Sequence, residues 1–240
     1  MDIVKNIFKR SSIGTMIFFT LNALVIVGIF AGSGYESLLT MLVLYIVSVM
    51  VAFSPFGEWM LGLVVGAREM KRIDMKNRML PLLDAVYRGA KRKTPGLADN
   101  IVLKVMYTPE PNAYALGRRT VCVTEGLFRL PDDEVKGILA HELGHLACRH
   151  TEIQLLIGGG NFIVTMLILM LKIISVITAT FSLYSGYQNR SWVPVIVGLL
   201  LAATIWLWTR FCMLFLMWSM RENEYVADRY AAELGYGYEL

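Results

Sequence analysis

The stretch GILAHELGHLACRH, residues 137–150, contains all three histidines of the 240-residue chain. Two of them, His141 and His145, are four residues apart, so their side chains project from the same face if the stretch is helical. Two imidazoles in this arrangement can bind one tetrahedral zinc ion, and Glu142 lies close enough to reach a zinc-bound water without being a ligand. This H-E-x-x-H pattern is typical of a catalytic zinc site with two histidine ligands and a general base. The alternative is a structural helix whose histidines only form caps or hydrogen bonds.

A third zinc ligand has to come from elsewhere, because a catalytic zinc ion keeps three protein ligands and one open position. The strongest candidates lie in SMRENEYVADRYAAEL, residues 219–234, a strongly helix-forming run. Glu224 and Asp228 are four residues apart and share one face, whereas Glu222 points elsewhere. One of the two acids would bind zinc and the other would orient a histidine ligand. The alternative is a solvated acidic face balanced by neighbouring arginines.

The composition is typical of a membrane protein. Hydrophobic residues make up 56% of the chain and charged residues 18%, and the mean hydropathy is +0.54, which is more apolar than an average soluble domain. Four stretches are long enough to cross a bilayer as helices, at residues 13–31, 37–57, 153–171 and 191–209. The three cysteines have no paired spacing, so a reducing compartment is expected rather than a disulfide framework.

Lys and Arg near the ends of these stretches predict their orientation. Nine of them lie in residues 67–93 and three in residues 1–10, whereas the loop GSGYES, residues 32–37, has none. Both termini and the central part are therefore expected on the cytoplasmic side. The first stretch is too long for a signal peptide and a second follows it directly, so a membrane anchor is expected. A hairpin of the last two stretches would return Glu224 to the membrane face that carries His145.

The polar middle of the chain predicts a small α+β domain. Apolar residues at helical spacing predict a helix over residues 74–91. Its broad apolar face consists of Met75, Met79, Leu82, Leu83, Val86 and Tyr87. Residues 101–108 and 119–128 are rich in β-branched side chains and predict two strands. Residues 130–150 predict a helix with acidic residues in its first turn, where the helix dipole favours them.

Four residues outside the ligand set carry separate expectations. His150 lies half a helical turn from His141, so if the helix continues it faces away from the metal and lies at the membrane surface. Gly144 lowers helix stability, so we expect it to let another backbone or a substrate approach, with a neutral packing role as the alternative. Lys172 and Arg210 interrupt the last two stretches. Snorkelling to the membrane surfaces is favoured over a role in binding substrate or lipid.

Three runs resemble the HtpX-type membrane zinc metallopeptidases, relatives of the CAAX-prenyl endopeptidases. They are GILAHELGHLACRH, EPNAYALGRRTVCVTEGLF at residues 110–128, and RENEYVADRYAAELGY at residues 221–236. The resemblance extends over essentially the whole chain. Members of that family usually continue past the position of residue 240 with more helix and a His-Pro segment, so any residue of that tail that stabilises the transition state lies outside this sequence.

The resemblance implies a definite set of roles. One Zn²⁺ per chain is bound by His141, His145 and Glu224. Glu142 is the catalytic base, and Asp228 orients a ligand histidine from behind. The activity implied is zinc-dependent hydrolysis of peptide bonds.

The resemblance also implies a substrate-binding edge strand, formed by Asn112, Ala113, Tyr114 and Ala115, to which an extended peptide adds as a further strand. An ordinary loop-to-strand transition is the alternative. The implied partners are the lipid bilayer and membrane-protein or unfolded polypeptide substrates at the cytoplasmic face of the inner membrane, in protein quality control under stress. No nucleic acid partner is expected, and the oligomeric state is not predicted.

The predicted fold is an α-helical membrane protein with four transmembrane helices and a cytoplasmic α+β zincin-like domain of the gluzincin type. Residues 1–66 form a two-span anchor, and residues 67–152 form the catalytic domain. Residues 153–218 form a transmembrane hairpin, and residues 219–240 form a cytoplasmic helix with the third zinc ligand.

Other functions fit the sequence less well. A site-2-type intramembrane protease would carry the histidines within a span and take an Asp ligand from an N-P-D-G-like run, which this chain lacks. A CAAX-prenyl-type endopeptidase would be longer, with more spans. A non-catalytic zinc-binding membrane scaffold or regulator is the remaining alternative, and Glu142 disfavours it because a structural zinc site needs no base.

Overall fold

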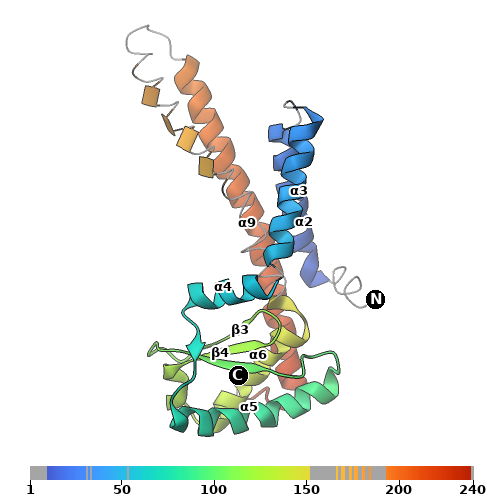
Figure 1. Ribbon diagram of the computed structural model, residues 1–240, viewed down its shortest axis with the longest axis vertical. Coiled ribbons are helices and arrows are strands. Elements are labelled where there is room, and N and C mark those ends of the chain that lie inside the picture. The colour runs from blue at the N-terminus through green and yellow to red at the C-terminus, as the bar shows by residue number, and fades with distance from the viewer. Residues whose placement is uncertain are drawn as a thin grey trace.

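The computed structural model describes residues 10–30, 32, 34–52, 54–151 and 193–238, together with scattered positions between 166 and 184. A small α+β domain lies at one end of the molecule, and long helices rise from it (Figure 1). The predicted α+β domain is therefore confirmed.

Four strands form one sheet in the order β1-β2-β4-β3. Their bounds are β1 (Arg68–Glu69), β2 (Val102–Met106), β3 (Ala113–Leu116) and β4 (Thr120–Thr124). β2 and β4 pair in parallel, and β1 and β3 add antiparallel on either side. β4 is buried at every position, as expected of a strand covered on both faces. The two predicted strands are confirmed but are shorter than expected, and a 3-10 helix, η2 (Glu125–Arg129), follows β4.

Helix α5 (Ile73–Lys93) confirms the predicted amphipathic helix. Its buried residues are Met75, Met79, Leu82, Leu83, Val86 and Ala90. This face joins the inner residues of the strands and of α6 (Asp132–Ala147) in one hydrophobic core. Val86, Val121 and Leu139 represent the three parts of this core, and each is 0% exposed.

The prediction of one helix over residues 130–150 is wrong at its C-terminal end. α6 ends at Ala147, and Arg149 adopts a left-handed backbone conformation with φ 59°. Because a residue in this conformation cannot continue a right-handed helix, the chain turns sharply before His150. The expectation that His150 faces away from the site is therefore wrong.

The rising helices are α2 (Arg10–Phe30), α3 (Tyr35–Ala52) and the upper part of α9 (Val193–Glu233). α9 has 41 residues and is about 60 Å long, and its last part confirms the helix predicted over residues 219–234. α2 packs against α9, where Phe18 and Leu216 are buried together. A Cβ atom on Gly14 would lie 2.4 Å from the carbonyl oxygen of Phe215, so only glycine allows this close approach.

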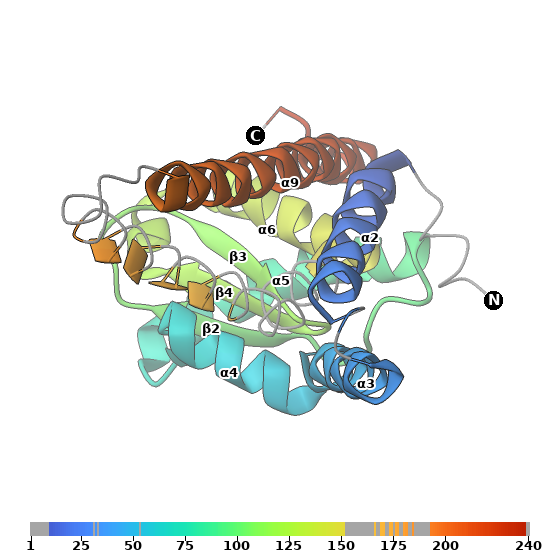
Figure 2. The same ribbon diagram turned by 90° about the horizontal axis from the view of Figure 1, so that it is seen from above.

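The chain breaks between α3 and the short helix α4 (Pro55–Val65), within the second predicted stretch, residues 37–57. Ser54 caps α4 by accepting a hydrogen bond from the backbone N–H of Gly57, 3.4 Å away. Glu58 of α4 accepts a hydrogen bond from the hydroxyl of Thr120, 2.9 Å away, and so ties this helix to β4. In the view from above, the strands lie between α4 and α9 (Figure 2).

Within the part of the chain that the structure describes, no helix has both the length and the apolar character needed to cross a membrane. The four predicted transmembrane helices are therefore not confirmed. Most of the third predicted stretch, and Lys172, lie outside the described residues. Arg210 is exposed on α9, with its guanidinium 5.4 Å from the ring centre of Trp206.

Candidate metal centre

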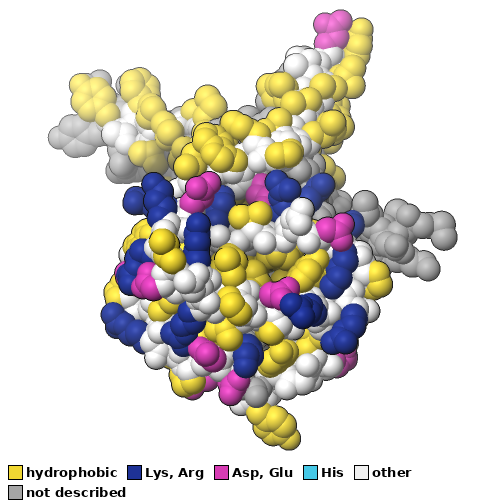
Figure 3. All heavy atoms as spheres, turned by 60° about the horizontal axis from the view of Figure 1, so that its bottom comes forward, with side chains coloured by type: hydrophobic (Ala, Val, Ile, Leu, Met, Phe, Trp, Pro, Cys, Tyr) yellow, Lys and Arg dark blue, Asp and Glu magenta, His cyan; other side chains and the backbone are white. Residues whose placement is uncertain are grey.

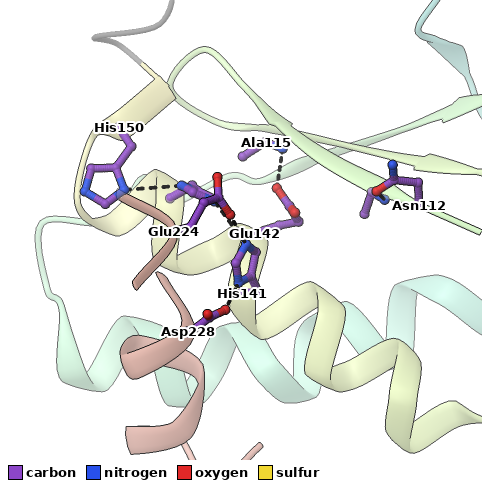
Figure 4. A network of polar contacts seen from close by, with 9 residues as sticks. Asn112, Ala115, His141, Glu142, His150, Glu224 and Asp228 are labelled. Atoms are coloured by element: carbon purple, nitrogen blue, oxygen red, sulfur yellow. Dashed lines mark hydrogen bonds and ion pairs between the residues drawn. The ribbon is translucent and has the colours of Figure 1, made fainter. Parts of the chain in front are cut away.

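The candidate site lies where α6 meets the last part of α9. α6 contributes His141, Glu142 and His145, and α9 contributes Glu224 and Asp228 (Figure 4). More than seventy residues separate the two groups in the sequence. The structure brings all five side chains together, as the sequence predicted.

Gly144 explains how the two helices approach so closely. A Cβ atom at this position would lie 3.2 Å from the Cα and the carbonyl oxygen of Ala227 and 3.2 Å from the Cβ of Tyr230. These neighbours are backbone atoms or lie next to the backbone, so they cannot move aside without moving α9. The expectation that Gly144 admits another backbone is confirmed, and that backbone is α9.

Three donor atoms from His141, His145 and Glu224 converge on one point. Nε2 of His141 and Nε2 of His145 are 3.1 Å apart, and Oε2 of Glu224 lies 3.2 Å from the first and 3.6 Å from the second. In a tetrahedral zinc site with ligand distances of about 2.0–2.1 Å, two ligand atoms are about 3.3 Å apart. The three donors therefore stand close to three corners of such a tetrahedron, and this group can hold a metal ion.

Asp228 determines which nitrogen of His141 faces the donor group. Its Oδ1 lies 2.8 Å from Nδ1 of His141, and an ionised carboxylate only accepts hydrogen bonds. Nδ1 therefore carries the proton, and the Nε2 lone pair points toward Glu224 and His145. When His145 also presents a lone pair on Nε2, the electron pairs of the donors converge and repel one another, and a metal cation between them removes the repulsion.

The environment of His145 favours the neutral imidazole. This side chain is buried, and burial lowers its pKa, with a further lowering from the neighbouring His141. A neutral imidazole is the form that binds a metal ion. Both histidines of α6 can therefore offer a lone pair to the same cation.

Glu142 lies beside the donor group and points toward the sheet (Figure 4). Its Oε2 accepts a hydrogen bond of 2.6 Å from the backbone N–H of Ala115 in β3. Burial raises the pKa of Glu142 to about 8; the Ala115 hydrogen bond opposes this shift, and the negative charge of Glu224 adds to it. A carboxyl group in this environment exchanges its proton close to neutral pH.

β3 is an edge strand, with β4 on one side and, among the described residues, no strand on the other. All four residues of β3 lie opposite residues of β4 in the antiparallel ladder. The backbone N–H groups of Ala113 and Ala115 bond to side chains, Oδ1 of Asn112 at 2.8 Å and Oε2 of Glu142. The edge position implied for this run is confirmed, although the strand itself begins at Ala113.

Two adjoining cavities open over the site, with volumes of about 620 Å³ and 270 Å³. Both are lined by Asn112, His141 and Glu142. The smaller one is also lined by Ala113, Tyr114, Ala115, His145, Thr151 and Glu224. The edge of β3 and the donor group therefore line the same space.

The sequence did not identify three groups that contact the site. His150 is buried, with Nδ1 3.2 Å from Nδ1 of His145, and the hydroxyl of Thr151 donates a 2.5 Å hydrogen bond to the carbonyl oxygen of Gly117. His150 was missed because the helix was expected to continue through it, and Thr151 lies beyond the predicted helix. The third group, the backbone N–H of Ala115, has no signal in the sequence, because only the register of β3 places it opposite Glu142.

The chain is similar to several proteins that carry the name of a protease. It is 29% identical over 178 residues to a Protease HtpX homolog of Halobacterium salinarum, and the alignment covers 72% of this chain and 53% of that protein. It is 28% identical over 160 residues to the Protease HtpX of Thioalkalivibrio sulfidiphilus, with 64% and 50% covered. A Protease HtpX homolog of Thermoplasma acidophilum is 32% identical over 114 residues, with 44% and 32% covered. The chain thus spans about half the length of the curated relatives it matches, or less.

A model of a protein family covers the site as well. The model of Peptidase family M48 matches residues 78–239, which is more than half of the chain. The matched residues include α6, the sheet edge at β3 and the part of α9 that carries Glu224 and Asp228. The chain therefore belongs to peptidase family M48, which confirms the resemblance to HtpX-type peptidases.

Proposed function

We propose that the chain is a zinc-dependent endopeptidase that hydrolyses peptide bonds beside the edge of β3. The observation that carries this function is the convergence of His141, His145 and Glu224 on one point, with Glu142 adjacent. Membership of Peptidase family M48 and similarity to proteins named Protease HtpX support the same activity.

Zinc fits the donor group better than other common divalent ions. Two imidazole nitrogens and one carboxylate oxygen are a ligand set of catalytic zinc sites, in which the fourth position stays open. Separations of 3.1, 3.2 and 3.6 Å between the donors match tetrahedral coordination. A bound zinc ion would supply Lewis-acid activation of the scissile carbonyl and of the attacking water. The proposed stoichiometry is one Zn²⁺ per chain.

Each residue of the site has a distinct role in this proposal. His141, His145 and Glu224 hold the ion, and Asp228 orients His141 through its Nδ1 proton. Glu142 is the general base, which takes a proton from the attacking water and gives it to the leaving amine. Its pKa of about 8 suits this exchange, and a positive charge at the donor group would lower that pKa toward 7.

The substrate strand is proposed to be Asn112, Ala113, Tyr114 and Ala115. An extended peptide that adds to β3 would use the outward backbone groups of Ala113 and Ala115. The N–H of Ala115 now bonds to Glu142, so a substrate carbonyl that accepts this N–H would release the carboxylate for the attacking water. Binding of the peptide and activation of the base would then be linked.

A membrane location is also proposed, with four spanning helices. The rising helices expose large hydrophobic side chains, among them Leu24, Leu39, Val43, Met50, Leu199, Leu207 and Leu214. Hydrophobic side chains gather on these helices, whereas basic and acidic side chains are spread over the domain (Figure 3). Exposed apolar surface of this extent is typical of helices that contact lipid.

In this arrangement residues 1–66 form the anchor and residues 67–152 the catalytic domain. Residues 153–218 form the hairpin, and residues 219–240 bring the third ligand back to the domain. Both termini and the site are proposed to lie at the cytoplasmic face of the inner membrane, and the nine basic residues of 67–93 support this orientation. The proposed substrates are membrane-proximal segments of damaged or unfolded proteins, in a quality-control role.

Proteolysis by the purified chain in lipid vesicles tests the activity. With an unfolded protein such as casein as substrate, wild type should cleave in a chelator-sensitive way, and Glu142→Gln should cleave about 10²–10⁴-fold more slowly while still binding zinc. Glu134→Gln, which changes an exposed acid in the first turn of the same helix, serves as the matched control. Equal rates for wild type and Glu142→Gln would contradict the role of Glu142. Zinc binding without cleavage in any variant would support the non-catalytic scaffold instead.

Extraction of membranes with alkaline carbonate tests the location separately. The chain should stay in the membrane fraction, because its exposed apolar helices would be embedded in lipid. Recovery of the full chain in the soluble fraction would contradict the membrane proposal without affecting the proposed zinc site.

A further inference from the structure

We propose that His150 is a positioning residue for His145: its imidazole accepts the Nδ1 proton of His145 and so directs the Nε2 lone pair of that side chain toward the metal ion. This role depends on the zinc site proposed above. It concerns a histidine that lies outside the H-E-x-x-H pattern and outside the donor group.

The two imidazoles form a buried pair. Their Nδ1 atoms are 3.2 Å apart, and the rings meet edge to face with centres 5.4 Å apart and planes at 68°. His145 is 6% exposed and His150 is 3% exposed. Between two ring nitrogens at this distance, one must donate and the other must accept.

Metal binding decides the direction of this hydrogen bond. If His145 offers its Nε2 lone pair to a cation, its proton is on Nδ1, so His145 donates and His150 accepts. The reverse arrangement would put the proton of neutral His145 on Nε2, between the other two donors, where it would block the ion. His150 in the accepting form therefore selects the tautomer of His145 that binds metal.

The two ligand histidines of α6 are then supported in different ways. Behind His141 is the carboxylate of Asp228, 2.8 Å away, whereas behind His145 is a second imidazole. Histidines that bind metals usually donate their remote N–H to a carboxylate, a backbone carbonyl or water. An imidazole acceptor in this position orients the ring without placing another negative charge beside Glu142 and Glu224.

The turn after α6 holds His150 in place. The left-handed backbone of Arg149 reverses the chain so that His150 returns to the helix it has just left. The hydroxyl of Thr151 then donates to the carbonyl of Gly117, in the turn between β3 and β4. His150 is therefore held against His145, while the next residue, Thr151, ties the chain to the turn that follows β3.

Zinc affinity of the full-length chain, measured in detergent by competition with a fluorescent chelator, tests this role. His150→Leu keeps a comparable apolar volume but removes the acceptor, and it should weaken zinc binding about 10–100-fold. His150→Asn places an amide oxygen near the position of Nδ1, so it should recover most of the lost affinity. Asp228→Asn is the benchmark, because it alters the partner of the other ligand histidine.

The visible spectrum of the Co²⁺-substituted protein is the second readout. His150→Leu should change its intensity and band positions, whereas His150→Asn should resemble wild type. Wild-type affinity and an unchanged spectrum for His150→Leu would overturn the proposal, and so would an equal loss in the Leu and Asn variants. If His150→Leu does not fold, the comparison of His150→Asn with His150→Gln decides. The longer Gln side chain does not place its oxygen at the position of Nδ1, so His150→Gln should bind zinc more weakly than His150→Asn. Equal zinc affinities for these two variants would also overturn the proposal. Wild type that binds no zinc would instead refute the proposed function itself.

Discussion

The domain and the helices that rise from it use hydrophobic residues in opposite ways. In the domain, Val121 and Leu139 are 0% exposed, and charged side chains are spread over the outside, as Figure 3 shows. On the rising helices, Met50 is 65% exposed and Leu214 is 63% exposed. The domain is therefore stabilised by its own core, whereas the rising helices present an apolar surface to whatever surrounds them.

α9 belongs to both regions, which shows how the site depends on their junction. Its upper part exposes large hydrophobic residues, and its last turns carry Glu224 and Asp228 into the domain. The site is complete only where these turns meet α6. Changes within the domain and changes at the junction should therefore have different consequences.

The largest of the expected effects on stability lies inside the domain, at Glu142. Its pKa is about 8 in the folded chain without metal, compared with a usual value of 4.5. Because folding raises the pKa of Glu142, the protonated carboxyl adds to the free energy of unfolding. This contribution is fully present below pH 4.5 and is lost as the pH rises through 8. Metal-free Glu142→Gln should therefore become more stable than metal-free wild type as the pH rises from 5 to 9, by an amount on the order of a few kcal/mol.

Urea unfolding of both proteins in chelator across this pH range measures the difference. Glu134→Gln, at an exposed position of the same helix, should show no comparable divergence from wild type. If the difference in the free energy of unfolding between Glu142→Gln and wild type were the same at all pH values, the pKa of Glu142 would not be raised in the folded chain.

A smaller effect is expected at the junction, from Gly144→Ala. The added methyl group would press on the backbone of Ala227, so we expect the free energy of unfolding to fall by about 1–2 kcal/mol and zinc affinity to fall with it. Gly89→Ala is the matched control, because its Cβ would lie an ordinary 3.6 Å from a side-chain atom of Leu234. That control should gain up to about 1 kcal/mol from helix propensity.

Thermal unfolding and chelator competition on the two glycine variants provide the comparison. Effects of the same sign and size would mean that the contact between α6 and α9 at Gly144 is not a tight one. Loss of zinc affinity in Gly89→Ala would show that the site responds to any change in the domain.

Much of the domain and of the donor group could be predicted from local patterns. Helical spacing identified the buried face of α5, and the same rule placed His141 beside His145 and Glu224 beside Asp228. Both signals are periodic within a single element, so they need no knowledge of the tertiary structure. Pairing the two helices required a further inference, from the spacing of the apolar stretches between them.

What could not be predicted depends on single backbone angles and on strand register. The left-handed backbone of one residue, Arg149, is the reason that His150 contacts His145 and does not face away from the site as predicted. Arginine has no intrinsic preference for that conformation, so the sequence carries no signal for the turn. The bond from Ala115 to Glu142 likewise follows from the register of β3 with β4. The separate helix α4, which Ser54 caps, was not predicted as an element of its own.

The metal content of three purified proteins tests the central claim most directly, namely that α6 and α9 together form one zinc site. Wild type should bind about one zinc ion per chain after reconstitution, and Glu224→Gln should lose most of it, because one of three protein ligands is weakened. Glu222→Gln, which changes an acid two residues away that is not part of the donor group, should bind as wild type does. Equal zinc content in wild type and Glu224→Gln, or loss of zinc in Glu222→Gln, would contradict the account.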